Sequence, residues 1–289
     1  MIQQLAIIGA GLIGSSLALA LREAGYVGEV IGFGRNRDNL ERGVELGVLD
    51  KFGESLSATV EKADVVVVAV PLGAMASVFA EIDAVVKPGA VITDVGSAKG
   101  SVIAAANQNL KRSLHRFVPG HPIAGTENSG VEAGFSSLYQ NRRVILTPTS
   151  RTDADATALI TQMWCQCGAL VERLEVDHHD RVLAATSHLP HMLAFTLVHH
   201  LSGLNEHEEI FRFAAGGFRD FTRIASSDPV MWRDICLANG DMLIDLIEQY
   251  QKELDQLVDA VRLTDGNALL QLFDKAKSER DSLMQAAHE

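Results

Sequence analysis

The sequence predicts a protein of two parts, an α/β domain built on a parallel sheet followed by an all-α domain. Short apolar runs alternate with amphipathic runs through the first half, as in βα units. Runs such as Asp64–Val70 lack alternation between apolar and polar residues, which is typical of strands buried on both faces. From about Asp177 onward long helical patterns replace the strand-like runs. We therefore place the boundary near residues 170–176 and divide the chain into 1–173 and 174–289.

The elements follow from these patterns in chain order. The strands that we expect in the first domain are Leu5–Ile8, Val30–Phe33, Val65–Val70, Val91–Asp94 and Val144–Thr147. The long helices that we expect in the second domain are Arg181–Leu201, Pro229–Leu263 and Asn267–Gln285.

One long helical segment presents an apolar stripe. Between Trp232 and Leu263, apolar residues recur at spacings of three and four, which places them on one face of a helix. Such a stripe needs a partner surface. We expect a second copy of the helical domain to supply it, so the chain should form a homodimer.

Composition excludes several classes of protein. The 289 residues are 47% hydrophobic and 21% charged, as in an ordinary globular protein, and the formal net charge is −12. Such a charge argues against broad nucleic-acid or anionic-membrane surfaces. The longest uncharged stretch, 65–80, is broken by Pro71 and Gly73, so we expect no membrane span. Because 1–8 lacks the features of a signal peptide, we expect a cytoplasmic protein.

The cysteines and paired histidines give no metal signature. Cys165, Cys167 and Cys236 have neither a disulfide pattern nor zinc spacing, so we expect reduced thiols. His188 and His191 stand three residues apart, but no third ligand at a zinc spacing accompanies them. We therefore expect no metal.

A glycine-rich loop follows the first expected strand. Gly9, Gly11 and Gly14, with Leu12 and Ile13 between them, form the pattern G-x-G-x-x-G directly before a helical run. The first glycine allows a tight turn, the second lets the backbone approach a pyrophosphate, and the third lets the helix pack on the strand. The amides at the helix N-terminus can then bind the phosphates. The context predicts a Rossmann-type dinucleotide site.

The end of the second expected strand leaves the choice of cofactor open. An Asp or Glu at this point binds the ribose 2′-hydroxyl of NAD. This chain instead has Gly34 and Arg35, with Arg37 close by. NADP is therefore possible beside NAD. The alternative is that both arginines are solvated loop residues or stack on the adenine.

Three further segments are rich in polar residues of catalytic type. Asp94–Gly100 reads Asp-Val-Gly-Ser-Ala-Lys-Gly, 119–127 reads Pro-Gly-His-Pro-Ile-Ala-Gly-Thr-Glu, and 217–223 reads Gly-Phe-Arg-Asp-Phe-Thr-Arg. The first two follow strands at the carboxyl side of the sheet, where ligands of open α/β sheets bind. A cleft between the two domains would bring all three together.

These segments, with Ser-His-Leu-Pro-His at 187–191 and the run from 217 to Trp232, resemble the prephenate/arogenate (cyclohexadienyl) dehydrogenase family. The resemblance extends from the glycine loop to at least Trp232. It implies a Rossmann domain, a dimerising helical domain, and oxidative decarboxylation of prephenate or arogenate in tyrosine biosynthesis, with hydride transfer to NAD or NADP. We expect no appended regulatory domain, so any inhibition by tyrosine would act within these two domains.

The resemblance also assigns the site. His121 matches the catalytic histidine, Ser97 its partner for the substrate hydroxyl, and Arg223 the residue that binds a substrate carboxylate. The residues that match other positions of the family's active site are Glu127, His188, His191, Asp220 and Trp232. The departure is Gly34-Arg35, where many relatives carry Asp, and it concerns cofactor preference. Prephenate and arogenate are not distinguished.

The residue types also suit the chemistry by themselves. An imidazole such as that of His121 can accept the proton of an alcohol as hydride leaves the alcohol carbon. A guanidinium such as that of Arg223 can hold a carboxylate bidentately. Lys99 and Arg219 would add positive charge to the site or form structural ion pairs with their neighbours. The other histidines, His178, His179, His199 and His200, are expected at the surface.

Overall fold

The main sheet has six parallel strands. In the computed structural model, which describes residues 1–126 and 128–286, they lie in the order β3-β2-β1-β4-β5-β6. The strands are β1 (Ile2–Ile8), β2 (Val27–Phe33), β3 (Lys51–Phe52), β4 (Val65–Val68), β5 (Val91–Asp94) and β6 (Phe117–Val118). This is the order of a dinucleotide-binding sheet, in which the connection reverses direction between β1 and β4. The predicted fold class of this part is confirmed.

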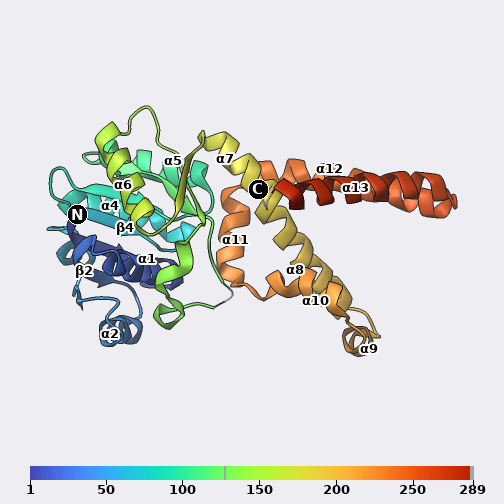
Figure 1. The fold of residues 1–289 in the computed structure, drawn as a ribbon, viewed down its shortest axis with the longest axis horizontal. Helices are drawn as coiled ribbons and strands as arrows, with labels where there is room; N and C mark the ends of the chain where they lie inside the picture. The colour runs from blue at the N-terminus through green and yellow to red at the C-terminus, as the bar shows by residue number, and fades with distance from the viewer. Residues whose placement is uncertain (127, 287–289) are drawn as a thin grey trace. The chain divides into compact units, whose positions relative to one another are not determined.

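Helices cover both faces of this sheet (Figure 1). They are α1 (Leu12–Glu23), α2 (Arg37–Glu45), α3 (Leu56–Val60), α4 (Met75–Val85), α5 (Lys99–Asn109) and α6 (Ala154–Gln166). Side chains alternate between the two faces of a strand, so Leu5 of β1 joins the core under α1 and α6 while Ala6 joins the core under α4 and α5. The buried faces fix the sheet on which the site is built.

A second, smaller sheet holds the histidine segment. Its strands are β7 (Gly120–Pro122), β8 (Arg143–Leu146) and β9 (Leu170–Arg173), with β7 antiparallel to β8 and β8 parallel to β9. His121 pairs with Ile145 in this register. The expected strand Val144–Thr147 is therefore present, but in this sheet and not in the main one.

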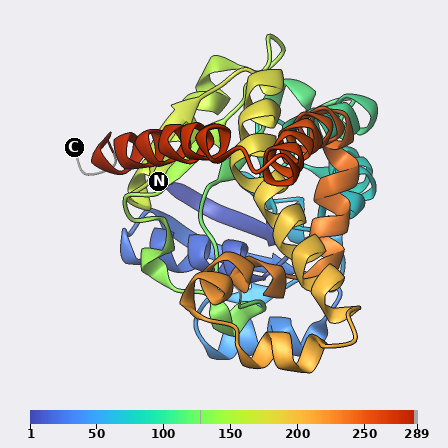
Figure 2. The same ribbon diagram turned by 90° about the vertical axis from the view of Figure 1, so that its right-hand side faces the viewer.

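Helices follow β9 to the end of the described chain, as predicted. They are α7 (Val176–Leu183), a π-helical turn (Ala184–His188), α8 (Leu189–Ser202), α9 (His207–Arg212), α10 (Gly216–Thr222), α11 (Pro229–Ala238), α12 (Gly240–Arg262) and α13 (Gly266–Ala286). Here α7 packs on α5, and α10 packs on α8 (Figure 2). Residues Met1–Gly240 form one compact unit, and the described residues from Asp241 onward form another.

The prediction of a single helix over Pro229–Leu263 is wrong, because the structure has two helices there, α11 and α12. The backbone leaves the helical conformation at Asn239, with φ −120° and ψ 33°, and a new helix begins at Gly240. The side chain of Asn239 hydrogen-bonds to α7 and to the π-helical turn instead, which explains the break. The apolar spacing alone could not reveal it, because it continues through both helices.

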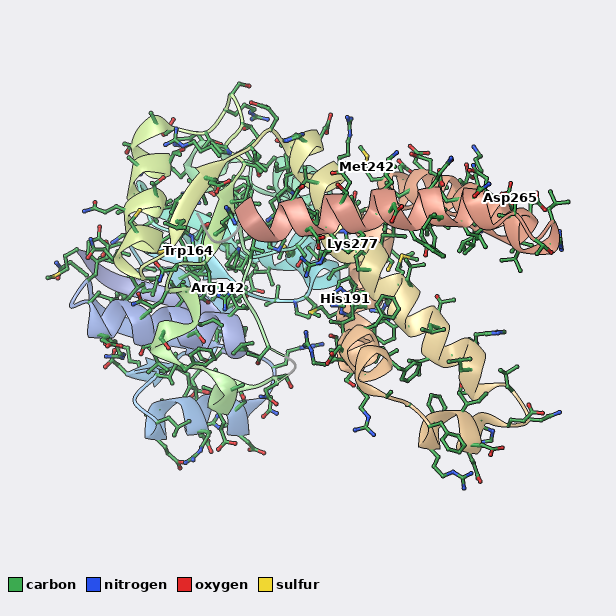
Figure 3. All side chains as sticks on the ribbon, turned by 45° about the vertical axis from the view of Figure 1, so that its right-hand side comes forward. Arg142, Trp164, His191, Met242, Asp265 and Lys277 are labelled. Carbon is green, nitrogen blue, oxygen red and sulfur yellow. The ribbon has the colours of Figure 1, made fainter. Side chains whose placement is uncertain are left out.

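The second unit consists of α12 and α13, joined by a turn that contains Asp265 (Figure 3). Part of the predicted apolar stripe, with Tyr250, Leu254 and Val261, is exposed in the single chain, as is the nearby Val258. None of the described helices combines the length and the apolar character needed to cross a membrane.

Candidate active site

The glycine loop has the geometry that a pyrophosphate requires. Gly9 has φ +103°, and a Cβ there would lie 2.3 Å from the carbonyl oxygen of Ala69. A Cβ on Gly14 would lie 2.5 Å from the carbonyl oxygen of Gly9. At Gly11, by contrast, a Cβ would meet no atom within 4 Å, and no side chain caps the N-terminus of α1. The loop therefore leaves amides and space for the phosphates of a dinucleotide.

The two candidate arginines that follow β2, Arg35 and Arg37, have different surroundings. Arg37 is already engaged, because its guanidinium lies 2.9 Å from Glu41 and 3.6 Å from Glu54. Arg35 is exposed and pairs with no acidic group among residues 1–126 and 128–286. A Cβ on Gly34 would meet only the Leu40 side chain, at 3.8 Å, so the fold does not exclude a carboxylate there. Arg35 is the cation that remains available to a ligand.

A buried ion pair anchors the catalytic side of the sheet. Lys99 is completely buried at the start of α5, and its ammonium donates to Asp94 Oδ2 at 2.5 Å and to the Gly120 carbonyl at 2.6 Å. The Gly120 amide donates in turn to Asp94 Oδ1 at 3.1 Å. Burial lowers the pKa of Lys99, whereas the charge of Asp94 opposes this shift. The pair fixes the backbone directly before His121, as the structural alternative for Lys99 predicted.

Replacing Lys99 by Met should lower the free energy of unfolding by about 3–5 kcal/mol, because Asp94 would remain buried without its partner. Lys51→Met removes one member of an exposed pair with Glu29 and should cost no more than about 1 kcal/mol. Urea denaturation followed by tryptophan fluorescence measures both, since Trp164 and Trp232 lie in the Met1–Gly240 unit. Equal losses in the two variants would contradict the account.

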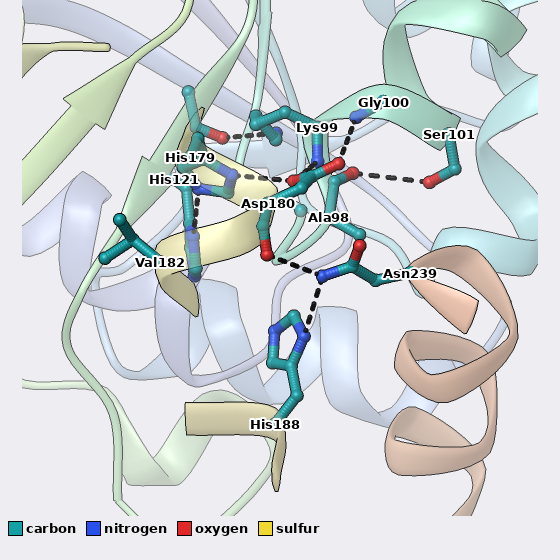
Figure 4. A network of polar contacts seen from close by, with 12 residues as sticks. Ala98, Lys99, Gly100, Ser101, His121, His179, Asp180, Val182, His188 and Asn239 are labelled. Carbon is teal, nitrogen blue, oxygen red and sulfur yellow. Dashed lines mark hydrogen bonds and ion pairs between the residues drawn. The ribbon is translucent and has the colours of Figure 1, made fainter. Parts of the chain in front are cut away.

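His121 lies at the end of a chain of buried hydrogen bonds (Figure 4). Its Nδ1 is 2.9 Å from Nε2 of His179, and Nδ1 of His179 is 2.7 Å from Oδ1 of Asp180. Burial lowers the pKa of His121 well below 6.5, and the positive charge of Lys99, with that of His179 and His188 when these are protonated, lowers it further. His121 is therefore neutral at physiological pH, with Nε2 as the ring nitrogen left for a ligand.

A second branch of the same network orients His188. The amide nitrogen of Asn239 donates to the Asp180 carbonyl at 2.8 Å and lies 3.2 Å from Nδ1 of His188. Because a carbonyl only accepts, this atom is the NH₂ group, and Nδ1 of His188 is its acceptor. Burial lowers the pKa of His188 to about 4. The neutral ring must then carry its proton on Nε2, which is buried without a partner among the described residues.

His191 and Trp232 form the wall beside this donor. Their rings stack with centroids 3.7 Å apart and an interplanar angle of 20°, and His188 meets Trp232 edge-on. The indole N–H of Trp232 is also buried and has no partner in the part of the chain that the structure describes. Burial lowers the pKa of His191, and the nearby charge of Arg223 adds to this effect. Two buried N–H donors and a cation thus gather here.

Comparisons with known proteins agree with this geometry. A family profile described as "Prephenate dehydrogenase, nucleotide-binding domain" matches residues 17–173, and one described as "Prephenate dehydrogenase, dimerization domain" matches residues 175–275. A cyclohexadienyl dehydrogenase of Zymomonas mobilis is 38% identical over 97% of this chain and 96% of its own length.

The chain belongs to the prephenate dehydrogenase family. It is an oxidoreductase with an NAD-binding domain. A crystal structure of prephenate dehydrogenase from Aquifex aeolicus, in complex with hydroxyphenyl propionate and NAD⁺, covers 98% of this chain and 99% of its own at 35% identity and a TM-score of 0.91. A Synechocystis arogenate dehydrogenase covers 97% of this chain and 100% of its own, at 28% identity and a TM-score of 0.80.

The structure gives fewer contacts for the other residues that the resemblance to prephenate dehydrogenases assigned to the site. Ser97 lies half-buried in the loop between β5 and α5, and its side chain hydrogen-bonds to no other described residue. Asp220 is exposed on α10, without an ion pair to any described residue. Glu127 lies outside the described residues. The structure also gathers no group of three or more possible metal ligands within residues 1–126 and 128–286.

One sequence-based expectation within this prephenate dehydrogenase site is wrong. His179 was expected at the surface, yet it is completely buried and contacts His121. His178, next to it, is exposed as predicted. The difference arises because α7 packs on α5 through one face, which carries His179 and Asp180. The helical spacing of the residues in α7 could have indicated that one face of this helix is buried. That spacing does not identify the helix on which α7 packs.

Proposed function

We propose that this chain oxidatively decarboxylates prephenate, arogenate or both, giving 4-hydroxyphenylpyruvate or tyrosine. The observation that carries the proposal is the neutral, buried His121, which lies near His188 and its buried, unpaired Nε2 donor. Arg223 lies near His191 and supplies a cation. The glycine loop, with Gly9, Gly11 and Gly14, would hold NAD, which would supply the hydride acceptor for the ring carbon that bears the hydroxyl.

The chain's own residues handle the proton. As hydride leaves, the hydroxyl proton passes to Nε2 of His121 and the carbon–oxygen bond becomes a carbonyl. The bond to the ring carboxylate then breaks, carbon dioxide leaves, and its electron pair makes the ring aromatic. The resulting phenolate oxygen can take the proton back from His121. Prephenate and NAD⁺ thus give the phenol, carbon dioxide and NADH with no net proton at this residue.

We assign the remaining roles by position and chemistry. Arg223 would bind a substrate carboxylate, because it is exposed next to His191 and has no acidic partner among the described residues. The N–H donors of His188 and Trp232 would meet substrate oxygens, since a ligand would satisfy groups otherwise buried unpaired. Ser97 would assist at the hydroxyl. The assignments of Glu127, Asp220 and His191 rest on the family resemblance.

Several larger features extend the proposal. We place the functional boundary at 173/174, so that 1–173 bind the dinucleotide and 174–289 serve substrate binding and dimerisation. The exposed apolar residues of α12, including Leu254 and Val258, would be covered in a homodimer. Tyrosine resembles the phenolic product, so product inhibition would act at the same site.

A rate matrix tests the proposed activity. Prephenate and arogenate are each combined with NAD and NADP, and reduced cofactor, aromatic product and carbon dioxide are measured together. We expect turnover in at least one combination, with the three products in equal amounts. Reduced cofactor without carbon dioxide would indicate a simple alcohol oxidation, and no turnover in any combination would overturn the proposal.

NADP should support turnover at a rate within about tenfold of NAD, a difference of about 1.4 kcal/mol. The reason is that Gly34 presents no carboxylate to repel the 2′-phosphate and Arg35 is available to bind it. Gly34→Asp should suppress NADP use and leave NAD use nearly unchanged, because the position has room for a side chain. An enzyme that binds NAD but shows no binding of NADP would contradict this assignment of Arg35.

A further inference from the structure

His179 is buried against His121, although the proposed proton transfer to His121 does not by itself require a second histidine. It lies on α7, its side chain is completely buried, and its ring meets that of His121 edge-on with centroids 5.1 Å apart (Figure 4). When two buried imidazoles form a hydrogen bond, a ring nitrogen of one donates and a ring nitrogen of the other accepts. Which of the two rings donates is determined by the group hydrogen-bonded to the other nitrogen of His179.

Asp180 fixes the direction from one end. Its carboxylate accepts from the backbone amides of Lys99 at 2.7 Å and Gly100 at 2.8 Å, at the N-terminus of α5. Burial raises the pKa of Asp180, but the hydrogen bonds from His179, Lys99 and Gly100 outweigh burial and lower it. Asp180 is therefore ionised and can only accept, so Nδ1 of His179 must donate.

The proton positions along the chain follow from this acceptor. With the proton of neutral His179 on Nδ1, its Nε2 carries a lone pair and can only accept. Nδ1 of His121, 2.9 Å away, must then carry the hydrogen of neutral His121. Nε2 of His121 is left with the lone pair that a general base needs.

We propose that His179 and Asp180 are positioning residues that hold His121 in the tautomer with its proton on Nδ1 and so direct the Nε2 lone pair at the substrate hydroxyl. This inference rests on the proposed role of His121 as the base. A buried carboxylate that orients a histidine through one hydrogen bond has a known counterpart in hydrolase triads. Here a second imidazole transmits the orientation.

The pair should also favour the protonated state that His121 reaches during turnover. When His121 accepts a proton, its Nδ1–H bond to His179 becomes charge-assisted, with the Asp180 carboxylate behind it. The other charged or titratable groups facing this cluster are Lys99 on α5, Asp94 on β5 and His188 on the π-helical turn. Lys99 is paired with Asp94, which leaves Asp180 as the net charge next to His179.

The proposal can be tested first with matched variants of His179. His179→Leu removes the acceptor in a similar volume and should lower kcat by roughly 10–10³-fold, because both orientation and the hydrogen bond to Nδ1 are lost. The KM for prephenate and the affinity for NAD should stay within about twofold. His179→Gln can offer an amide oxygen to His121 and should recover most of the lost rate.

The pH dependence of kcat/KM separates positioning from a structural role. As an acceptor, His179 favours protonated His121, so His179→Leu should move the acidic limb to lower pH. If His179 were instead a second cation, its removal would move the limb to higher pH. A limb that stays in place or moves upward, with kcat near that of the unchanged chain, overturns the proposal.

Proton positions can be read directly in the full chain without turnover. Nitrogen-15 spectra of labelled histidines should show both His121 and His179 protonated on Nδ1 at neutral pH, whereas a proton on Nε2 of His121 would overturn the proposal. This measurement decides the question even if His179→Leu does not fold. Failure of the underlying function is distinguishable, because His121→Asn would then retain its rate. If His121 is the base, His179→Leu should have little further effect in the His121→Asn chain.

Discussion

His121→Asn should lower kcat with prephenate by roughly 10²–10⁴-fold, the usual contribution of a positioned general base. Asparagine has a similar size and still hydrogen-bonds, but it cannot accept the hydroxyl proton at neutral pH. Because His121 lies in β7 beside the buried network and not in the glycine loop, cofactor affinity should be unchanged.

Steady-state rates and cofactor titration measure both quantities. His178→Asn is the matched control, since His178 is an exposed neighbour of His179 on α7. It should retain kcat within about twofold. Near-normal kcat in His121→Asn would show that another group takes the proton and that His121 only shapes the backbone before Pro122.

Arg223→Ala should raise the KM for prephenate by about 10–150-fold, because a charge-assisted hydrogen bond to a carboxylate contributes about 1.5–3 kcal/mol. The affinity for NAD should hardly change, since Arg223 lies by His191 in the helical part. Arg223→Lys keeps the charge without the planar fork and should fall between the two.

Arg219→Ala provides the control within the same segment. Arg219 is exposed on α10, four residues before Arg223, and its loss should change KM by no more than about twofold. Equal increases in KM for the two variants would point to a general charge effect. Parallel weakening of substrate and cofactor in Arg223→Ala would indicate a folding defect and contradict the assigned contact.

The features that depend on local sequence could be predicted well. The glycine loop and β5 (Val91–Asp94) lie where expected, because a turn with positive φ and an apolar strand buried on both faces have short sequence signals. The strands β3, β6, β7 and β9 were missed. They are two to four residues long and exist only through pairing with distant partners.

The unpredicted parts of the site depend on contacts distant in sequence. His179 reaches His121 across 58 positions, and Asn239 reaches Asp180 across 59. Neither relation leaves a periodic pattern, because each depends on how α7 and α11 pack against other elements. The contacts of Asn239 also explain the break between α11 and α12. Its side chain hydrogen-bonds to the buried network, and its backbone is not helical.

The most direct test of the account is the pH profile of kcat/KM for prephenate in the unchanged chain and in His121→Asn, with substrate loss corrected by a control without enzyme. His121 must be neutral to accept the proton, so activity should fall as pH drops through its pKa. Burial lowers that pKa well below 6.5, so the limb should lie on the acid side of 6.5, with a plateau above. We expect the limb to vanish in His121→Asn. The same limb in both proteins would contradict the assignment of His121 as the base.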